Sequence, residues 1–313
     1  MNGLELSRAY FEAFGRQMLE DQFPELLPHL AAGLFGSGSE CFGFDDEVSR
    51  DHDFEPGFCI FLPGEEVVNR RQAFLLERAY AKLPKEFEGL ERQRMQPVGG
   101  PRHGVFRTAE FFTEKVGSPD GTLTLSQWMA VPSQALAEAV NGALFFDNRG
   151  DVRRIRASLA RYPEDIRRKK LAGHLLLAAQ AGQYNYLRCL RHGETAAAQL
   201  AVCEFVRHTV STIFLLNETY EPYYKWSFRA LRALPKLSIE AELLEYLLTT
   251  DNEPETAEEK YSVIEGIASD LIDELITQTL TRANCGDLEK HAYSVNDEVA
   301  DPAIRNLHIL AGV

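Results

Sequence analysis

The chain of 313 residues carries 47 acidic against 33 basic side chains, which gives a formal net charge of −14. This excess of acid argues against binding nucleic acid over a broad surface, although a local basic pocket for a triphosphate remains compatible with it. No apolar run approaches the roughly 18 residues that cross a bilayer, and the charged N-terminal segment does not resemble a signal peptide. The five cysteines form no CxxC pair, so we expect reduced thiols, a cytoplasmic protein and no membrane partner.

The first half of the chain mixes helical and strand-like patterns. Apolar residues recur at helical spacing in residues 4–22 and 65–82, which predicts two amphipathic helices. Short apolar, aromatic or β-branched stretches between turn residues predict strands at residues 30–36, 53–63, 104–117 and 143–150.

The second half is predicted to be almost entirely helical. The acidic stretch at residues 249–260 is expected to be a solvated connection between helices. This change of pattern predicts an α/β (α+β) domain with a mixed sheet in residues 1–155 and an all-α helical bundle in residues 156–313. No specific interface signal is seen, so the oligomeric state stays open.

Two consecutive Gly-Ser pairs end the strand predicted at residues 30–36. They are Gly36-Ser37 and Gly38-Ser39. Glycine lets backbone N–H groups approach a phosphate closely, because a Cβ would block that approach, and serine adds a hydroxyl donor. These four residues are therefore candidate contacts for a triphosphate.

Asp51 and Asp53 follow the Gly-Ser pairs and precede an apolar stretch. In a strand, residues i and i+2 point to the same face, so the two carboxylates would lie side by side and repel each other unless a cation separates them. Mg²⁺ takes such oxygen ligands, and two ions about 4 Å apart can clamp the oxygens of a phosphoryl transfer. An Asp-x-Asp alone is commonly a solvated turn, but its place after the Gly-Ser pairs favours a metal site.

The spacing of these motifs resembles the signature of the nucleotidyltransferase superfamily, in which a hydrophobic residue and Gly-Ser precede Asp-x-Asp. Here FGS at residues 35–37 is separated by thirteen residues from DHD at residues 51–53, and His52 replaces the apolar residue that is usual there. The string GSGSECFGFDDEVSRDHD at residues 36–53 resembles a bacterial family known only as domain of unknown function 4037. The resemblance extends through residues 180–188 and 217–226.

The resemblance implies a nucleotidyltransferase-like domain followed by a helical substrate- or nucleotide-binding domain, the layout of the aminoglycoside adenylyltransferases. It also implies that Gly36 and Ser37 hold the triphosphate while Asp51 and Asp53 bind metal. Such enzymes often carry a third carboxylate on a later strand, as metal ligand or general base. Glu110 is the candidate, with Glu114 as the second choice; alternatively, Glu110 is an edge-strand residue that faces water.

The segment EPYYKWSFR, residues 221–229, supplies flat aromatic faces for a base together with two cations. Lys225 and Arg229 lie four residues apart and share a face if the segment is helical. A lysine there would neutralise the leaving pyrophosphate, and Tyr224 is a candidate for stacking. The alternative is an aromatic contact between helices with snorkelling cations.

The sequence therefore predicts an enzyme that moves a nucleoside monophosphate, AMP from ATP in the first instance, to an acceptor hydroxyl with two Mg²⁺ ions and release of pyrophosphate. The acceptor, a small molecule or a protein, and the preferred base are left open. The alternative is a catalytically weak nucleotide-binding or regulatory protein on the same fold. A helical-domain ribonuclease, as in some toxin pairs, fits less well. Such domains carry an Arg and a His with four to six residues between them, whereas only three residues separate Arg188 from His192 here.

Overall fold

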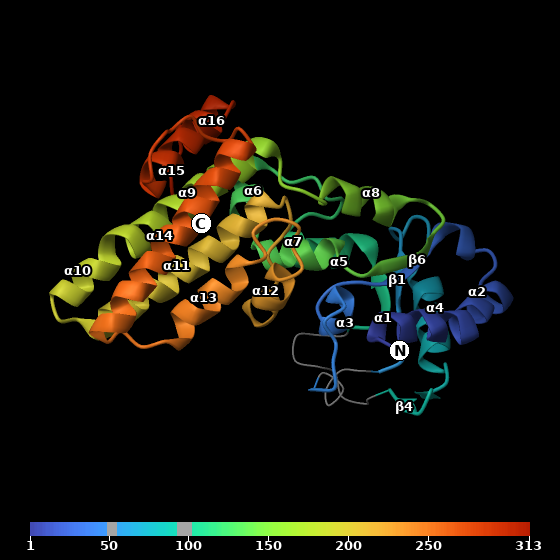
Figure 1. The fold of residues 1–313 in the computed structure, drawn as a ribbon. Helices are drawn as coiled ribbons and strands as arrows, with labels where there is room; N and C mark the ends of the chain where they lie inside the picture. Colours follow the sequence, from blue (N-terminus) through green and yellow to red (C-terminus); the bar gives the residue numbers. More distant parts are fainter. Residues whose placement is uncertain (49–54, 93–101) are drawn as a thin grey trace. The chain divides into compact units, whose positions relative to one another are not determined.

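The computed structural model describes residues 1–48, 55–92 and 102–313 (Figure 1). Contacts within the chain group it into two compact units. The first comprises Met1–Thr124 and Val131–Ala160, and the second comprises Leu125–Ala130 and Arg161–Val313. The domains expected at residues 1–155 and 156–313 stay a prediction, because a grouping by contacts does not test independent folding.

A four-stranded sheet in the order β5-β2-β1-β6 forms the centre of the first unit. Its strands are β1 (Ala31–Leu34), β2 (Cys59–Leu62), β5 (Gly104–Arg107) and β6 (Ala143–Asp147). β1 pairs antiparallel with β2 and β6, whereas β2 and β5 run parallel. The predicted mixed sheet is therefore confirmed. A second sheet pairs β3 (Glu86–Phe87) with β4 (Leu90–Glu91).

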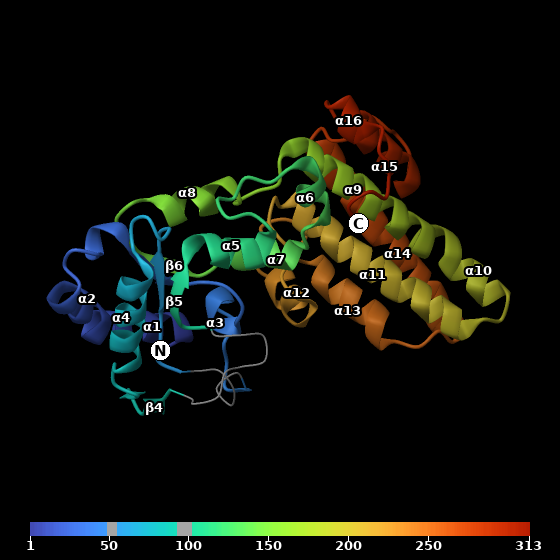
Figure 2. The ribbon, with the colours of Figure 1, turned by 180° about the vertical axis from the view of Figure 1, so that it is seen from behind.

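Alternating side chains of β2 serve two separate helical layers, as strand geometry requires. Ile60 and Leu62 join the core beneath α1 (Gly3–Tyr10), α2 (Arg16–Gln22) and α4 (Arg70–Ala81). Phe61 faces the other way. Its ring stacks on that of Phe35, with ring centres 4.6 Å apart, and makes an edge-to-face contact with Phe111, with ring centres 5.2 Å apart. α4 and α5 (Thr108–Val116) both contact β5 (Figure 2).

The N-terminal helix predicted at residues 4–22 is confirmed, with one irregularity. A π-helical turn, Phe11–Gly15, joins α1 to α2. A Cβ on Gly15 would lie 2.4 Å from the ring of Phe58, so the glycine lets this turn pack closely on the aromatic core. Other helical segments described in this unit include η2 (Leu27–His29), α3 (Ser39–Phe42), α7 (Ser133–Val140) and α8 (Asp151–Ser158).

The strand predicted at residues 104–117 is wrong beyond Arg107. Only β5 is extended, and Thr108–Val116 forms α5. Thr108 Oγ1 donates to Leu62 O at 3.0 Å where the chain turns, and Gly117 ends the helix with a φ of 74°. Aromatic and β-branched residues suggested a strand, but Phe112 and Val116 lie four residues apart and are both buried, which is helical spacing.

The second unit is helical throughout, which confirms the predicted all-α character of this part of the chain. Its longest helices are α9 (Glu164–Ala178), α11 (Thr195–Leu216) and α14 (Pro254–Thr277), and α11 contacts both of the others (Figure 1). The other helical segments are α6 (Leu125–Ala130), η4 (Ala179–Asn185), α10 (Tyr186–Arg191), α12 (Tyr224–Leu231), α13 (Glu240–Thr249), α15 (Leu288–Asp297) and α16 (Pro302–Arg305). Among the described residues, no helix is both long and apolar enough to span a membrane.

The acidic stretch at residues 249–260 is not simply a solvated connection. α14 begins at Pro254, a residue suited to the first helical turn. Lys260 is fully buried, and its Nζ donates to Gln199 Oε1 at 3.0 Å and to Thr250 O and Asp251 O at 3.2 Å each. The acidic composition of this stretch gave no indication that Lys260 is buried. Its hydrogen bond to Gln199 joins the start of α14 to α11.

A buried carboxyl gives the second unit a pH-dependent stability. Burial, together with the charge and hydrogen bond of Asp270, raises the pKa of Glu240 from 4.5 to about 7. Because the pKa of this acid is raised in the folded state, the contribution of Glu240 to the free energy of unfolding is largest below pH 4.5 and is lost as the pH rises through 7. We expect Glu240→Gln to be about 1–3 kcal/mol more stable than wild type at pH 8 and little changed at pH 4.5, as measured by urea unfolding. An equal gain at both pH values would show that charge is not the cause.

Candidate functional site

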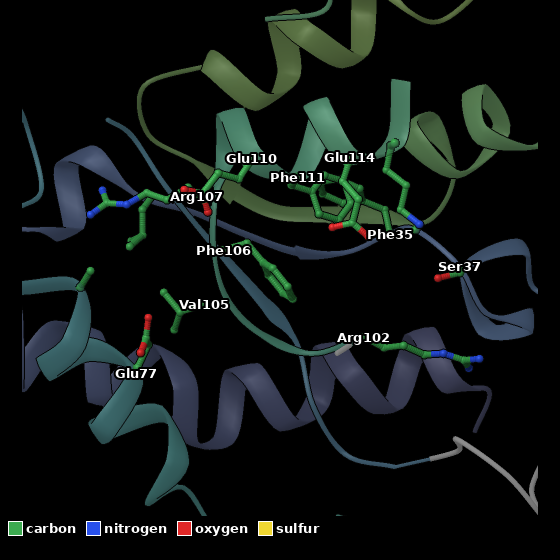
Figure 3. A pocket seen from close by; sticks show the side chains of 14 residues that line it. Phe35, Ser37, Glu77, Arg102, Val105, Phe106, Arg107, Glu110, Phe111 and Glu114 are labelled. Atoms are coloured by element: carbon green, nitrogen blue, oxygen red, sulfur yellow. The ribbon is translucent and has the colours of Figure 1, made fainter. Parts of the chain in front are cut away.

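A cavity of about 280 Å³ opens in the first unit beside the end of β1 (Figure 3). It brings the first Gly-Ser pair together with side chains of β5, α4 and α5. Its lining residues are Phe35, Gly36, Ser37, Leu62, Ala73, Glu77, Arg102, Val105, Phe106, Arg107, Glu110, Phe111, Glu114 and Lys115.

The Gly-Ser pairs form a tight turn between β1 and α3. Gly36 and Gly38 have φ angles of 125° and 127°, a region that residues with a Cβ rarely adopt. Gly36 and Ser37 line the cavity, whereas Gly38 and Ser39 lead into α3. The sequence pattern therefore located the turn correctly, and its role in binding a triphosphate stays a prediction.

Asn141 and Gly142, which were not among the residues predicted from the sequence, directly precede β6 and hold this turn from the β6 side of β1. Asn141 Oδ1 accepts from Gly36 N at 2.9 Å, and its Nδ2 donates to Gly36 O at 2.8 Å. Gly142 N donates to Cys41 O at 2.8 Å. An Asn-Gly pair marks a turn in any sequence, but nothing in the sequence indicates a partner 105 residues away.

Arg156 supports the same segment from α8. It donates to Val140 O at 2.7 Å and to Asn141 O, and its guanidinium lies 4.5 Å from the centre of the Phe35 ring. Burial lowers the pKa of Arg156. These contacts link the residue before the Gly-Ser turn to the segment that fixes the turn.

Glu110 and Glu114 lie one turn apart on α5, and both exposed side chains line the cavity. The expectation that Glu110 lies on a strand is wrong, because α5 carries it. The structure nevertheless places Glu110 in one cavity with Gly36 and Ser37. Figure 3 shows Glu110 and Glu114 reaching in from α5, with Ser37 at one end of the view and Glu77 toward the other.

Three basic side chains also line the cavity: Arg102, Arg107 and Lys115. Arg107 Nη1 donates to Pro63 O at 2.6 Å and Val68 O at 2.7 Å. Lys115 Nζ forms an ion pair with Glu138 at 2.6 Å. The cavity thus carries mixed charge, and two of its cations, Arg107 and Lys115, are held in place by partners of their own.

Glu40, another residue missed from the sequence, is buried beside the turn with 6% of its surface exposed. A Cβ on Gly38 would lie 2.4 and 2.6 Å from the two carboxyl oxygens of Glu40, so the glycine makes room for this side chain. Burial raises the pKa of Glu40, an effect that the charges of His103 and Arg102 oppose. The turn therefore packs against a carboxyl of its own.

Asp51 and Asp53 lie outside the described residues, so their catalytic and metal-binding roles stay predictions. Within residues 1–48, 55–92 and 102–313, no group of three or more His, Cys, Asp or Glu side chains is arranged to hold a metal ion. The metal site of the proposal below therefore depends on the two aspartates.

The remaining predicted contacts belong to the second unit. Tyr224, Lys225 and Arg229 are exposed on α12. Lys225 Nζ lies 4.9 Å from the Trp226 ring centre and the Arg229 guanidinium lies 5.9 Å from it, so both cations contact one indole. This is the helical arrangement that their spacing predicts. Their role in binding nucleotide stays a prediction.

Residues 128–227 match the family model of a domain of unknown function, DUF4037, which confirms over this part of the chain the resemblance inferred from the motifs. The chain is also similar to a nucleotidyltransferase-like protein from Exiguobacterium sibiricum 255-15 of known crystal structure. The two are 11% identical, the similarity covers 90% of each chain, and the TM-score is 0.38. No curated protein sequence matches the chain.

Proposed function

We propose that this protein is a Mg²⁺-dependent nucleotidyltransferase that moves a nucleoside monophosphate, AMP from ATP, to an acceptor hydroxyl. The observation that carries the proposal is the cavity in which Gly36 and Ser37, the first half of the sequence signature, meet Glu110 and three basic side chains. A turn of this kind offers N–H donors to a phosphate, and nearby cations favour the negative charge that develops on the leaving group.

In the proposed reaction, Glu110 accepts the proton of the acceptor hydroxyl while the hydroxyl oxygen forms a bond to the α-phosphorus of the nucleotide. The bond from that phosphorus to the bridging oxygen breaks, and pyrophosphate leaves with the electron pair. Ser37 and the neighbouring backbone N–H groups orient the phosphates. Asp51 and Asp53 supply the all-oxygen ligands that Mg²⁺ prefers, and the bound ion would neutralise phosphate charge. Tyr224, Lys225 and Arg229 are proposed to contact the nucleotide from the helical unit.

The test is a thermal melt with each of the four NTPs, with and without Mg²⁺. A ligand at 100 times its Kd raises the free energy of unfolding by about 2.7 kcal/mol. We therefore expect ATP with Mg²⁺ to raise the melting temperature of the wild type by the corresponding amount. The double variant Asp51→Ala with Asp53→Ala should lose this shift, since it removes both proposed metal ligands.

A pyrophosphate assay then separates the proposal from its alternative. Release of pyrophosphate with a screened acceptor supports transfer. A Mg²⁺-dependent shift without release under any acceptor favours a nucleotide-binding regulatory protein. The absence of a shift with every NTP, on folded wild type, would contradict both.

A further inference from the structure

One asparagine fixes the peptide groups on both sides of Gly36. Asn141 accepts from the Gly36 N–H and donates to the Gly36 carbonyl, at 2.9 and 2.8 Å. A planar amide that bonds both groups of one residue holds its orientation more firmly than a single bond could. We infer that Asn141 is a positioning residue for phosphate recognition by the Gly-Ser turn, an inference that rests on the function proposed above.

The bond to Asn141 changes which groups of the turn can meet a phosphate. The Gly36 N–H is already engaged, so Gly36 serves as the fixed point of the turn and not as a phosphate donor. Among the described residues, no backbone partner is found for the N–H groups of Ser37 and Gly38. We assign these two N–H groups, together with the Ser37 hydroxyl, as the donors to the anion.

The surroundings of Asn141 are built to keep it in place. Gly142 N bonds Cys41 O at 2.8 Å, beyond the far end of the turn, so adjacent residues hold the turn on both sides. Arg156 bonds the carbonyl of Asn141 itself. Gly36 and Ser37 line the cavity but Asn141 does not, so Asn141 acts through the turn and not by contact with a ligand. A misplacement of about 1 Å in such a supported site can cost on the order of a hundredfold.

The experiment compares Asn141→Leu with Asn148→Leu. Asn148 is a matched control, because it lies at the other end of β6 and its Nδ2 likewise donates to a backbone carbonyl, Leu27 O, at 2.8 Å. Calorimetry would measure binding of ATP and of inorganic tripolyphosphate, each with Mg²⁺, well below the melting temperature of every variant. We expect Asn141→Leu to weaken both ligands by at least about tenfold and Asn148→Leu to change either by less than about twofold.

A purely structural role for Asn141 would lower the melting temperature and leave both affinities unchanged in the folded protein; that result overturns the inference, as does an equal loss of affinity in the two variants. If Asn141→Leu does not fold, Asn141→Asp, which keeps an acceptor for the Gly36 N–H but cannot donate to its carbonyl, is judged by the same criterion. Wild-type protein that binds neither ligand overturns the proposed function and this inference together, whereas failure of the inference alone leaves wild-type binding intact.

Discussion

Glu110→Gln is expected to slow pyrophosphate release by about 10²–10⁴-fold, the usual contribution of a general base. The amide has nearly the shape of the carboxylate but cannot take the proton of the acceptor hydroxyl. Glu110 is exposed, lies in the first turn of α5 and lines the cavity that Gly36 and Ser37 enter. The rate would be measured with the acceptor that gives the fastest release in the wild type.

Glu114→Gln is the matched control, because Glu114 lies one helical turn further along α5 and lines the same cavity. We expect the Glu110 variant to lose its rate of pyrophosphate release while its ATP binding and melting temperature stay unchanged. The rate of the Glu114 variant should fall by less than about tenfold. The reverse pattern would move the base to Glu114. Equal and small losses in both would remove α5 from the chemistry.

The local parts of this fold were accessible from the sequence, while the contacts that complete the site were not. Leu30 to Gly36 is a short apolar stretch that ends in glycines, and it predicted β1 and the turn after it. Thr108–Val116 misled prediction because its β-branched and aromatic residues favour strands, whereas burial of Phe112 and Val116 on one face made it a helix. Tertiary packing decided between two locally plausible patterns.

The site shows the same division. The spacing of Gly36 and Ser37 from the aspartates pointed to the turn. Glu110 lines the same cavity as the turn, although the strand predicted for it is wrong, and its catalytic role stays a prediction. Asn141 could not be found, because its function depends on β6 lying beside β1, a pairing of residues more than a hundred positions apart. Glu40 was hidden for another reason: an acidic residue after a Gly-Ser turn ordinarily faces water.

Gly142→Ala is expected to destabilise the first unit by about 3–5 kcal/mol, the upper range for single substitutions. The residue has a φ of 59°, which alone costs a residue with a Cβ about 1–2 kcal/mol. The new Cβ would also lie 2.1 Å from Leu34 O and 2.9 Å from Phe35 Cα, and backbone atoms of a central strand cannot move aside as a side chain can. Urea unfolding with a probe in the first unit would measure the loss.

Gly150→Ala separates the two causes. Its φ is 76°, but no atom lies within 4 Å of the position that a Cβ would take, so it should show only the conformational cost of about 1–2 kcal/mol. If the two variants lose the same stability, the close approach of Gly142 to β1 is not the cause. If Gly142→Ala folds, the chain must relieve the overlap by displacing Leu34 and Phe35, which lead directly into Gly36. Its affinity for ATP with Mg²⁺ should then fall more than that of Gly150→Ala, because the same backbone that pairs in the sheet also presents the turn to the cavity.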